Sequence, residues 1–276
     1  MIIVGLFFEV DDLVLILDGK GRRYLFSLLE DGEFHCHAGI VSHNDIIGSQ
    51  AGSSVESTKG TSFRLLSPTL SDYILKMPRG AQVIYPKDHG TIITYADIFP
   101  GARVLESGVG SGALSISLLR AIGTTGQLIG YEVREDFAAQ AQRNVIKYMG
   151  NNLPWNVEVR DIYEGIDETD LDRIVLDLPE PWQVVDHAEK ALVPGGMIIS
   201  YSPSITQAVK TREKLEDSNF GMASTFETLL RGWHIDGQAV RPDHRMVAHT
   251  GFLTVARLLS ENTSANRSDK MLRRHK

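Results

Sequence analysis

The sequence predicts an α/β protein whose main domain is a parallel, doubly wound sheet, preceded by a small β-rich domain. Three observations indicate this. Short apolar runs broken by turns fill the first 70 residues or so, apolar runs and helical segments then alternate, and a glycine-rich turn follows the first of those later runs. Regular β-α alternation gives parallel strands covered by helices on both faces. A chain of 276 residues has room for both domains.

Residues 1–70 are expected to form a small antiparallel sheet or barrel. The runs LVLILD and YLFSLL are each followed by turn residues, and Asp-Gly turn dipeptides stand at 18–19 and 31–32. The apolar start MIIVGLFFEVDD lacks a basic segment and a small-residue cleavage site, so we interpret it as a strand and not a signal peptide. The Gly/Ser-rich stretch 48–60 is interpreted as a loop.

Residues 71–261 are predicted to form the main domain. The expected strands are ARVLESG, GQLIGYEV, WNVEVRD, LDRIVLDLP and GGMIISYS, and the expected helices are ALSISLLRAIG, REDFAAQAQRNVIKYMG and SITQAVKTREKLEDS. FETLLRGWHID and HTGFLTVARLL have no helix between them, which predicts an antiparallel hairpin finishing the sheet. Residues 262–276 are polar and basic, and we expect a disordered tail there.

The composition restricts the partners and the location of the protein. The net charge of −7 argues mildly against a general polyanion-binding protein, although a local basic patch sets the field that a ligand meets. No apolar stretch of about 18 residues exists, so no membrane association is expected. Cys36 is the single cysteine, which excludes an intrachain disulfide and favours a cytoplasmic location. The histidines show no metal-ligand spacing, so no metal is expected.

The segment RVLESGVGSGALSISLL places three glycines, Gly108, Gly110 and Gly112, between a strand and a helix. Ligands of doubly wound sheets bind outside the carboxyl ends of the strands, and glycine there permits positive φ and close backbone approach. Gly108, Gly110 and Ala113 also fit the dinucleotide pattern G-x-G-x-x-G/A. An NAD-linked oxidoreductase therefore remains an alternative on this motif.

Acidic residues at three successive strand ends favour a different ligand. Glu106 stands beside the glycine turn, where a carboxylate repels a pyrophosphate and suits a cationic, amine-bearing ligand such as S-adenosylmethionine. Glu132 ends the second strand and can accept hydrogen bonds from ribose hydroxyls. Asp161 ends the third strand and can accept from an adenine amino group, with Ile162 supporting the ring edge.

The fourth strand ends in IVLDLPEPW, in which Asp177 is followed by two prolines that stop the strand and stiffen its exit. This stretch resembles the Asp-Pro-Pro-Tyr type of motif in adenine-modifying methyltransferases. In such motifs a carboxylate or amide accepts a hydrogen bond from the exocyclic amine of adenine.

Together, QVIYPKD, ESGVGSGALS, DLPEPW and HRMVAHTGFLTVAR resemble the bacterial and archaeal tRNA (adenine-N1)-methyltransferase family, and its actinobacterial members in particular. The resemblance covers nearly the whole chain. It implies a Rossmann-like class I S-adenosylmethionine-dependent methyltransferase fold, a homotetramer, and a tRNA substrate modified at adenosine 58 in the T-loop, giving 1-methyladenosine.

The resemblance also implies site residues. Asp177 takes the position of the catalytic carboxylate, and Tyr85 that of its aromatic partner in the substrate pocket. Cofactor contacts are implied at Ile84, Ser111, Gly112, Ala113, Glu132, Asp161 and Ile162, in addition to Glu106, Gly108, Gly110 and Asp177. Adenine N1 carries a lone pair and no proton, so an anion that accepts from the N6 amine stabilises the growing positive charge without removing a proton first.

Candidate tRNA contacts are the basic tail, Arg22, Arg23, Arg79, Lys87, Arg241 and Arg245. The alternative functions are a methyltransferase of small molecules or proteins, the NAD-linked oxidoreductase, and a scaffold subunit that binds RNA without catalysis. The intact Glu106, Asp161 and Asp177 argue against the scaffold.

Overall fold

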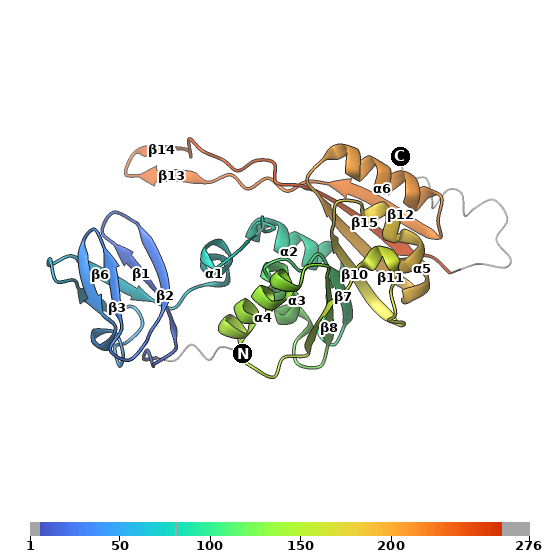
Figure 1. The fold of residues 1–276 in the computed structure, drawn as a ribbon. Helices are drawn as coiled ribbons and strands as arrows, with labels where there is room; N and C mark the ends of the chain where they lie inside the picture. The colour runs from blue at the N-terminus through green and yellow to red at the C-terminus, as the bar shows by residue number, and fades with distance from the viewer. Residues whose placement is uncertain (1–5, 81, 261–276) are drawn as a thin grey trace. The chain divides into compact units, whose positions relative to one another are not determined.

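The computed structural model describes residues 6–80 and 82–260, and the chain divides into two compact units (Figure 1). The first unit holds the residues up to Met77 together with 148–150, and the second holds the remainder. The predicted tail at 262–276 lies outside the described residues.

The first unit contains a four-stranded antiparallel sheet in the order β2-β1-β6-β5, together with a separate two-stranded pair. The strands are β1 (Leu13–Asp18), β2 (Arg23–Ser27), β5 (Ser54–Glu56) and β6 (Ser62–Leu66), and the pair is β3 (Glu33–Cys36) with β4 (Gly39–Ser42). The short helix α1 (Leu70–Lys76) follows. The buried core includes Val14, Ile16, Leu28, Val41, Phe63 and Leu65.

One expectation for this unit was wrong, and a second falls partly outside the described residues. The stretch 48–60 was expected to be a loop but contains β5, because Val55 is buried against the core and pairs with Phe63. The apolar start was expected to be a strand. Its described part makes only an isolated bridge between Phe7 and Gln50.

The second unit is built on a seven-stranded sheet in the order β12-β15-β11-β10-β7-β8-β9. The strands are β7 (Arg103–Ser107), β8 (Gln127–Glu132), β9 (Trp155–Val159), β10 (Leu171–Asp177), β11 (Leu192–Ser202), β12 (Phe220–Phe226) and β15 (Phe252–Leu258). Its helices are α2 (Pro86–Tyr95), α3 (Ala113–Ile122), α4 (Glu135–Met149), α5 (Val185–Ala191) and α6 (Ile205–Glu216). Strands β7 to β11 are mutually parallel, as predicted, and β15 runs antiparallel between β11 and β12.

The order of the parallel strands fixes where a ligand can enter. From β7 the chain winds outward through β8 to β9, then crosses back to β10 and winds the other way to β11. The order therefore reverses between β7 and β10, and ligands of doubly wound sheets bind at the carboxyl ends of the strands on either side of such a reversal. Buried side chains such as Leu105, Ile174 and Leu176 fill the core beneath these ends.

The end of the chain differs from the expected hairpin. FETLLRGWHID is not one strand, because β12 ends at Phe226 and β13 (Trp233–Asp236) begins a separate pair with β14 (Ala239–Pro242). Residues between Phe226 and Phe252 have no partner in the sheet and pair with each other around Gly237, whose φ is +54°. We call residues 229–249 the arm; Figure 1 shows its two strands apart from the seven-stranded sheet.

Candidate active site at the carboxyl ends of β7, β8 and β10

The glycine turn lies against the end of β10. Gly108 has a φ of +84°, and a Cβ there would collide with the backbone carbonyl of Asp177. A Cβ on Gly112, whose φ is +79°, would press on Val145 of α4. Gly110 is different, since a Cβ there would have no neighbour closer than 3.9 Å. Two glycines therefore serve the packing of the turn, and Gly110 faces open space that a ligand can approach.

Strand register places three carboxylates on one face of the sheet. Glu106 in β7 is opposite Val175, two residues before Asp177, and is also opposite Gly130, two residues before Glu132. Because side chains alternate along a strand, Glu106, Glu132 and Asp177 all point to the same side. This grouping agrees with the sequence prediction that these acids share one site.

Glu106 is buried, with 2 % of its surface exposed, and its Oε2 accepts a hydrogen bond of 2.6 Å from Ser115 Oγ in α3. Burial raises the pKa of this carboxyl, the Ser115 bond lowers it, and the nearby Asp177 and Glu132 raise it, and together these bring the pKa to about 8. At neutral pH the group therefore retains its proton unless a positive charge arrives beside it.

Glu132 holds the glycine turn. Its Oε2 accepts from the Gly110 amide at 2.8 Å, and its Oε1 accepts from the Arg134 amide at 3.0 Å. Both bonds come from the backbone, so the carboxylate fixes the turn while each oxygen keeps a further acceptor position. The expected ribose contact stays a prediction.

Asp161 follows β9 and begins a short 3-10 turn, η2 (Ile162–Glu164), where its Oδ1 accepts from the Tyr163 amide at 2.9 Å. Its Oδ2 accepts no hydrogen bond from any residue that the structure describes. Ile162 is buried, with 2 % exposure. The predicted adenine contacts therefore lie next to each other, with one carboxylate oxygen open to a donor.

Asp177 is the last residue of β10 and is partly exposed. Burial, together with a smaller contribution from the charge of Glu132, raises the pKa of its carboxyl to about 7. The loop after it is held in place, because Pro179 O accepts from Gln207 Nε2 at 2.7 Å and the Glu180 amide donates to Tyr163 Oη at 3.0 Å.

Tyr85 is the N-cap residue of α2 and is half-buried. The preceding Ile84 is buried, and its carbonyl accepts from His89 Nε2 at 3.0 Å. The other ring nitrogen of His89 lies 2.7 Å from Ser117 Oγ in α3, so the start of α2 is tied to the helix that follows the glycine turn. Burial lowers the pKa of His89 to about 4, which leaves it neutral at pH 7.

Sequence reasoning missed Tyr201. It lies in β11 directly opposite Asp177 in the parallel register, so both side chains stand on the same face of the sheet. Its Oη donates to Thr250 O at 2.5 Å, and its pKa is raised to about 12 by burial, with smaller contributions from charges that include Asp177. The signal was present in the run GGMIISYS, but only the pairing of β11 with β10 identifies the tyrosine.

The remaining predicted cofactor residues lie around the glycine turn. Ser111 and Ala113 are both buried at the start of α3. The Ser111 carbonyl accepts from Asn144 Nδ2 at 2.9 Å, which fixes the turn to α4. All predicted site residues of the second unit therefore belong to the β7 turn, to α2 or to the ends of β8, β9 and β10.

The acid cluster has no cationic partner in the described part of the chain. No lysine, arginine or histidine there forms an ion pair with Glu106, Glu132 or Asp177. Nor do the described residues include a group of three or more His, Cys, Asp and Glu placed to hold a metal ion. Carboxylates gathered beside an open glycine turn suit an organic cation, which is the chemistry of a sulfonium and an α-amino group.

The structure also tests the candidate tRNA contacts. Lys87 was expected to meet phosphate, but its side chain is only 6 % exposed and bonds to Asp88, Thr228 and Thr250, so that expectation was wrong. Arg79, Arg241 and Arg245 are exposed. In the first unit, Arg22 pairs with Asp18 and Arg23 with Asp72.

Two protein families match the chain. Residues 62–240 match the family described as tRNA methyltransferase complex GCD14 subunit, and residues 7–55 match the one described as TrmI-like N-terminal. Among curated relatives, the tRNA (adenine(57)-N(1)/adenine(58)-N(1))-methyltransferase TrmI of Methanocaldococcus jannaschii is 39% identical over 90% of this chain and 95% of its own length. The tRNA (adenine(58)-N(1))-methyltransferase TrmI of Thermus thermophilus is 36% identical over 88% and 96%.

Solved structures agree with the fold. A SAM-dependent O-methyltransferase from Thermotoga maritima superposes with a TM-score of 0.89 and 34% identity, covering 95% of this chain and 98% of its own. The tRNA (m1A58) methyltransferase TrmI from Aquifex aeolicus superposes with a TM-score of 0.80 and 28% identity, covering 92% and 100%. With the family match over residues 62–240 and relatives above 30% identity over most of its length, the chain belongs to the TrmI family of tRNA (adenine-N1)-methyltransferases.

Proposed function

We propose that this protein transfers the methyl group of S-adenosylmethionine to N1 of adenosine 58 in the T-loop of tRNA, giving 1-methyladenosine. The observation that carries the proposal is the cluster of Glu106, Glu132 and Asp177 beside the open glycine turn, in a chain of this family. Its carboxylates suit a cationic donor on one side, and Asp177 suits a base that becomes cationic on the other.

The residues present fit the cofactor. Glu106 offers a buried carboxyl to a positive charge, Gly110 leaves room at the turn, and Glu132 and Asp161 have acceptor positions for hydroxyl and amino donors. When bound, S-adenosylmethionine supplies an activated methyl group on a sulfonium. The match to the dinucleotide pattern G-x-G-x-x-A therefore does not require a dinucleotide ligand. The negative charge of a pyrophosphate would be repelled by these carboxylates.

Asp177 would act on the substrate as an anion. Its carboxylate accepts a hydrogen bond from the N6 amine of the extruded adenine, which stabilises the positive charge that develops on the ring as N1 is methylated. No proton has to leave N1 before attack, so Asp177 works by electrostatic stabilisation. Tyr201 is paired with Asp177 across β11 and β10, and Tyr85 is close enough to Tyr201 to contribute to its raised pKa. The two tyrosines would be aromatic supports for a base removed from its stack.

O-methylation is the second candidate, because the superposed structure from Thermotoga maritima carries that description. A hydroxyl acceptor requires removal of a proton, and a carboxylate with a pKa near 7, such as Asp177, can serve as a general base for it. The two reactions give different products on tRNA, namely a methylated base or a methylated ribose hydroxyl.

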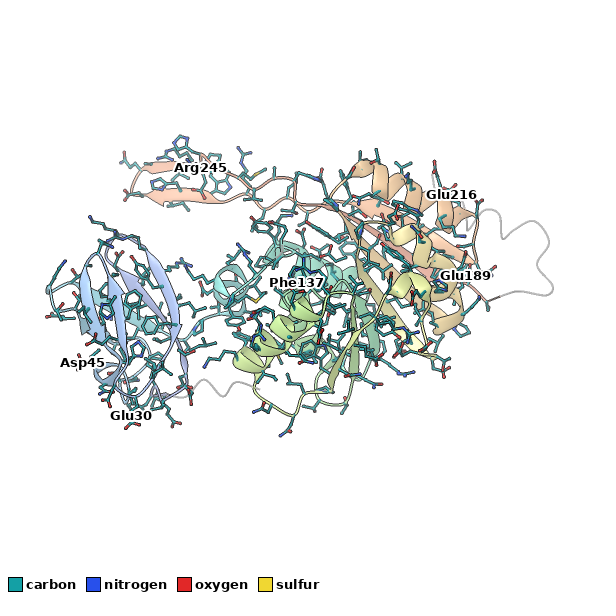
Figure 2. All side chains as sticks on the ribbon, viewed as in Figure 1. Glu30, Asp45, Phe137, Glu189, Glu216 and Arg245 are labelled. Atoms are coloured by element: carbon teal, nitrogen blue, oxygen red, sulfur yellow. The ribbon has the colours of Figure 1, made fainter. Side chains whose placement is uncertain are left out.

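We propose a homotetramer built through the arm. Trp233 is paired with Pro242, and Ile235 with Val240, so these four side chains share one face of the β13–β14 ribbon. Trp233, Ile235 and Val240 are 57%, 72% and 59% exposed. A lone two-stranded ribbon is marginally stable in water, so a partner subunit would cover this apolar face. Figure 2 shows the side chains of the arm, with Arg245 labelled.

Assembly would also help a chain of net charge −7 to bind RNA, because exposed arginines of several subunits would combine into one basic surface. No helix in the described part of the chain has the length and apolar character needed to cross a bilayer. A tRNA substrate is consistent with the cytoplasmic location expected from the sequence.

The test is transfer of labelled methyl groups from S-adenosylmethionine to an unmodified tRNA transcript, followed by nucleoside analysis and mapping. We expect 1-methyladenosine at position 58, and a transcript with guanosine at 58 should accept no label. Label in a ribose hydroxyl or on N6, or no label on any tRNA, would overturn the assignment.

A further inference from the structure

A buried ion pair lies at the start of α2, outside the acid cluster. The side chains of Lys87 and Asp88 are only 6 % and 1 % exposed, and Lys87 Nζ lies 2.8 Å from Asp88 Oδ1. Lys87 Nζ also donates to Thr250 Oγ1 and to Thr228 O, both at 2.6 Å. The Thr250 hydroxyl in turn donates to Asp88 Oδ2 at 2.7 Å. Every N–H of the ammonium and both carboxylate oxygens are therefore used.

The partners of this ion pair come from the two ends of the arm. Thr228 follows β12 and Thr250 precedes β15, so both connections between the sheet and the arm are bonded to α2. Thr228 Oγ1 also donates to Thr91 Oγ1 of α2 at 3.1 Å. The same two connections are joined to each other by Glu227 and His249, whose side chains lie 2.9 Å apart.

The ion pair is also linked to the reaction site. Thr250 O accepts the hydrogen bond from Tyr201 Oη, and the ring of Tyr201 packs so closely on Gly251 that a Cβ there would collide with it. Tyr201 faces the same side as Asp177 in the neighbouring strand. Tyr85 is two residues before Lys87, as the N-cap of the same helix. One set of hydrogen bonds thus fixes the backbone beside both tyrosines.

We propose that Lys87, Asp88 and Thr250 form a positioning network that holds Tyr201 and Tyr85 at the Asp177 site and joins that site to both ends of the arm. This inference rests on the proposed function, because it assigns the network a role in seating the target base. It goes beyond that function, since the three side chains bond to one another and to Thr228 and would act on the site only through the tyrosines.

A buried ion pair of this kind adds little net stability to a fold. Removing two charges from water costs several kcal/mol per ion, and apolar side chains of similar volume often stabilise a fold as well as a buried pair does. The ion pair instead fixes the relative positions of α2, Thr228 and Thr250, because its hydrogen bonds are all satisfied in one arrangement of these three parts. A small displacement of groups that hold a substrate is costly to catalysis.

The test uses Thr250→Val in the full-length protein, which keeps the side-chain volume and removes the hydroxyl. We expect kcat for tRNA methylation to fall about 10-fold, in line with the cost of misplacing a site by a fraction of an ångström, with the Kd for S-adenosylmethionine unchanged. Thr250→Ser restores the hydroxyl and should restore kcat. Thr225→Val is the matched control, because Thr225 bonds to Thr254 in the same sheet at 2.9 Å without reaching Tyr201.

A double-mutant cycle separates positioning from a general loss of packing. If Thr250 acts through Tyr201, the Thr250→Val/Tyr201→Phe double variant should be no slower than the slower of the two single variants. The network would be overturned if the fold-losses in kcat of the two single variants multiply in the double variant. It would also be overturned if kcat of the Thr250→Val enzyme is within twofold of that of the unaltered enzyme. If Thr250→Val fails to fold, Asp88→Asn enters the same cycle, with the same expected result.

The two proposals fail in different ways. An unaltered enzyme that methylates no tRNA would overturn the proposed function. An enzyme that methylates adenosine 58 normally, and still does so at full rate with Thr250→Val, would overturn the positioning network and leave the proposed function intact.

Discussion

The acid cluster and the arm belong to the same unit and are opposite in character. In the cluster, Glu106 and Glu132 are buried and hydrogen-bonded, yet no cation pairs with them in the described chain. In the arm, apolar side chains such as Trp233 and Ile235 stand in solvent. The cluster therefore lacks a positive charge, and the arm lacks an apolar surface to pack against. The difference indicates a small cationic ligand for the first and an apolar protein surface for the second.

The largest expected effect lies in the cluster. Asp177→Ala removes the acceptor for the N6 amine, and we predict a fall in kcat of about 10²–10³, the usual cost of losing one group that stabilises transition-state charge. Calorimetry should find that the affinity for S-adenosylmethionine falls far less than kcat does. Asp177→Asn keeps an acceptor oxygen, so its kcat should fall less than that of Asp177→Ala. An Asp177→Ala enzyme with unchanged single-turnover rate would remove this residue from the mechanism.

The next effect concerns cofactor binding alone. Asp161→Ala removes the open Oδ2 next to Ile162, and we predict a Kd for S-adenosylmethionine about 10-fold higher, corresponding to about 1.4 kcal/mol, with kcat at saturation retained. Asp167→Ala is the control, since it deletes a 73% exposed carboxylate from the same loop. Equal Kd values for the two variants would contradict the adenine contact.

In the arm, the prediction concerns assembly. Trp233→Ser combined with Ile235→Ser removes apolar surface from the face that a partner would cover, so light scattering should find a smaller particle than for the unaltered protein. His234→Ser changes the other face of the same strand and should leave the mass unchanged. If the unaltered protein is already a monomer, the proposed assembly is wrong.

The last effect concerns stability and not activity. The pKa of Glu106 is about 8 in the folded protein and near 4.5 when unfolded, so the folded state binds an extra proton between these pH values. The free energy of unfolding therefore falls as pH rises through this window. Glu106→Gln lacks this titration. Without cofactor, the melting temperature of this variant should rise relative to that of the unaltered protein as the pH increases from 5 to 8. The expected difference is about 4–8 °C for each 2 kcal/mol of difference in the free energy of unfolding.

The control for that prediction is Glu164→Gln, which changes an exposed glutamate of η2 near the same site. Its melting temperature should track the unaltered protein across the whole pH range. A Glu106→Gln variant that behaves in the same way would mean that the buried carboxyl carries no proton at neutral pH.

The local sequence pattern was sufficient to predict the parallel strands and the acidic residues at their ends. A strand's apolar run shows where it stops, so Glu132 and Asp177 were placed correctly from the sequence. The glycine turn was also found, although the collisions that require Gly108 and Gly112 depend on β10 and α4, which lie far along the chain.

Features that depend on long-range pairing were missed. Tyr201 became a site residue only through the register of β11 against β10. Lys87 resembled a surface cation until Thr228 and Thr250, more than 140 residues later, were seen to surround it. The arm resembled strands of the main sheet because Trp233 and Ile235 are as apolar as core residues, and no local pattern shows that they lack a sheet partner.

The most direct measurement of the central claim is the proton release that accompanies cofactor binding. Calorimetric titration with S-adenosylmethionine at pH 7.5, in buffers of different ionisation enthalpy, reports it. A cation entering the cluster should lower the pKa of Glu106 and of Asp177, so we predict release of about one proton. S-adenosylhomocysteine, which lacks the sulfonium charge, should release less, and Glu106→Gln/Asp177→Asn almost none. A binding heat that is identical in every buffer for the unaltered protein would contradict the account.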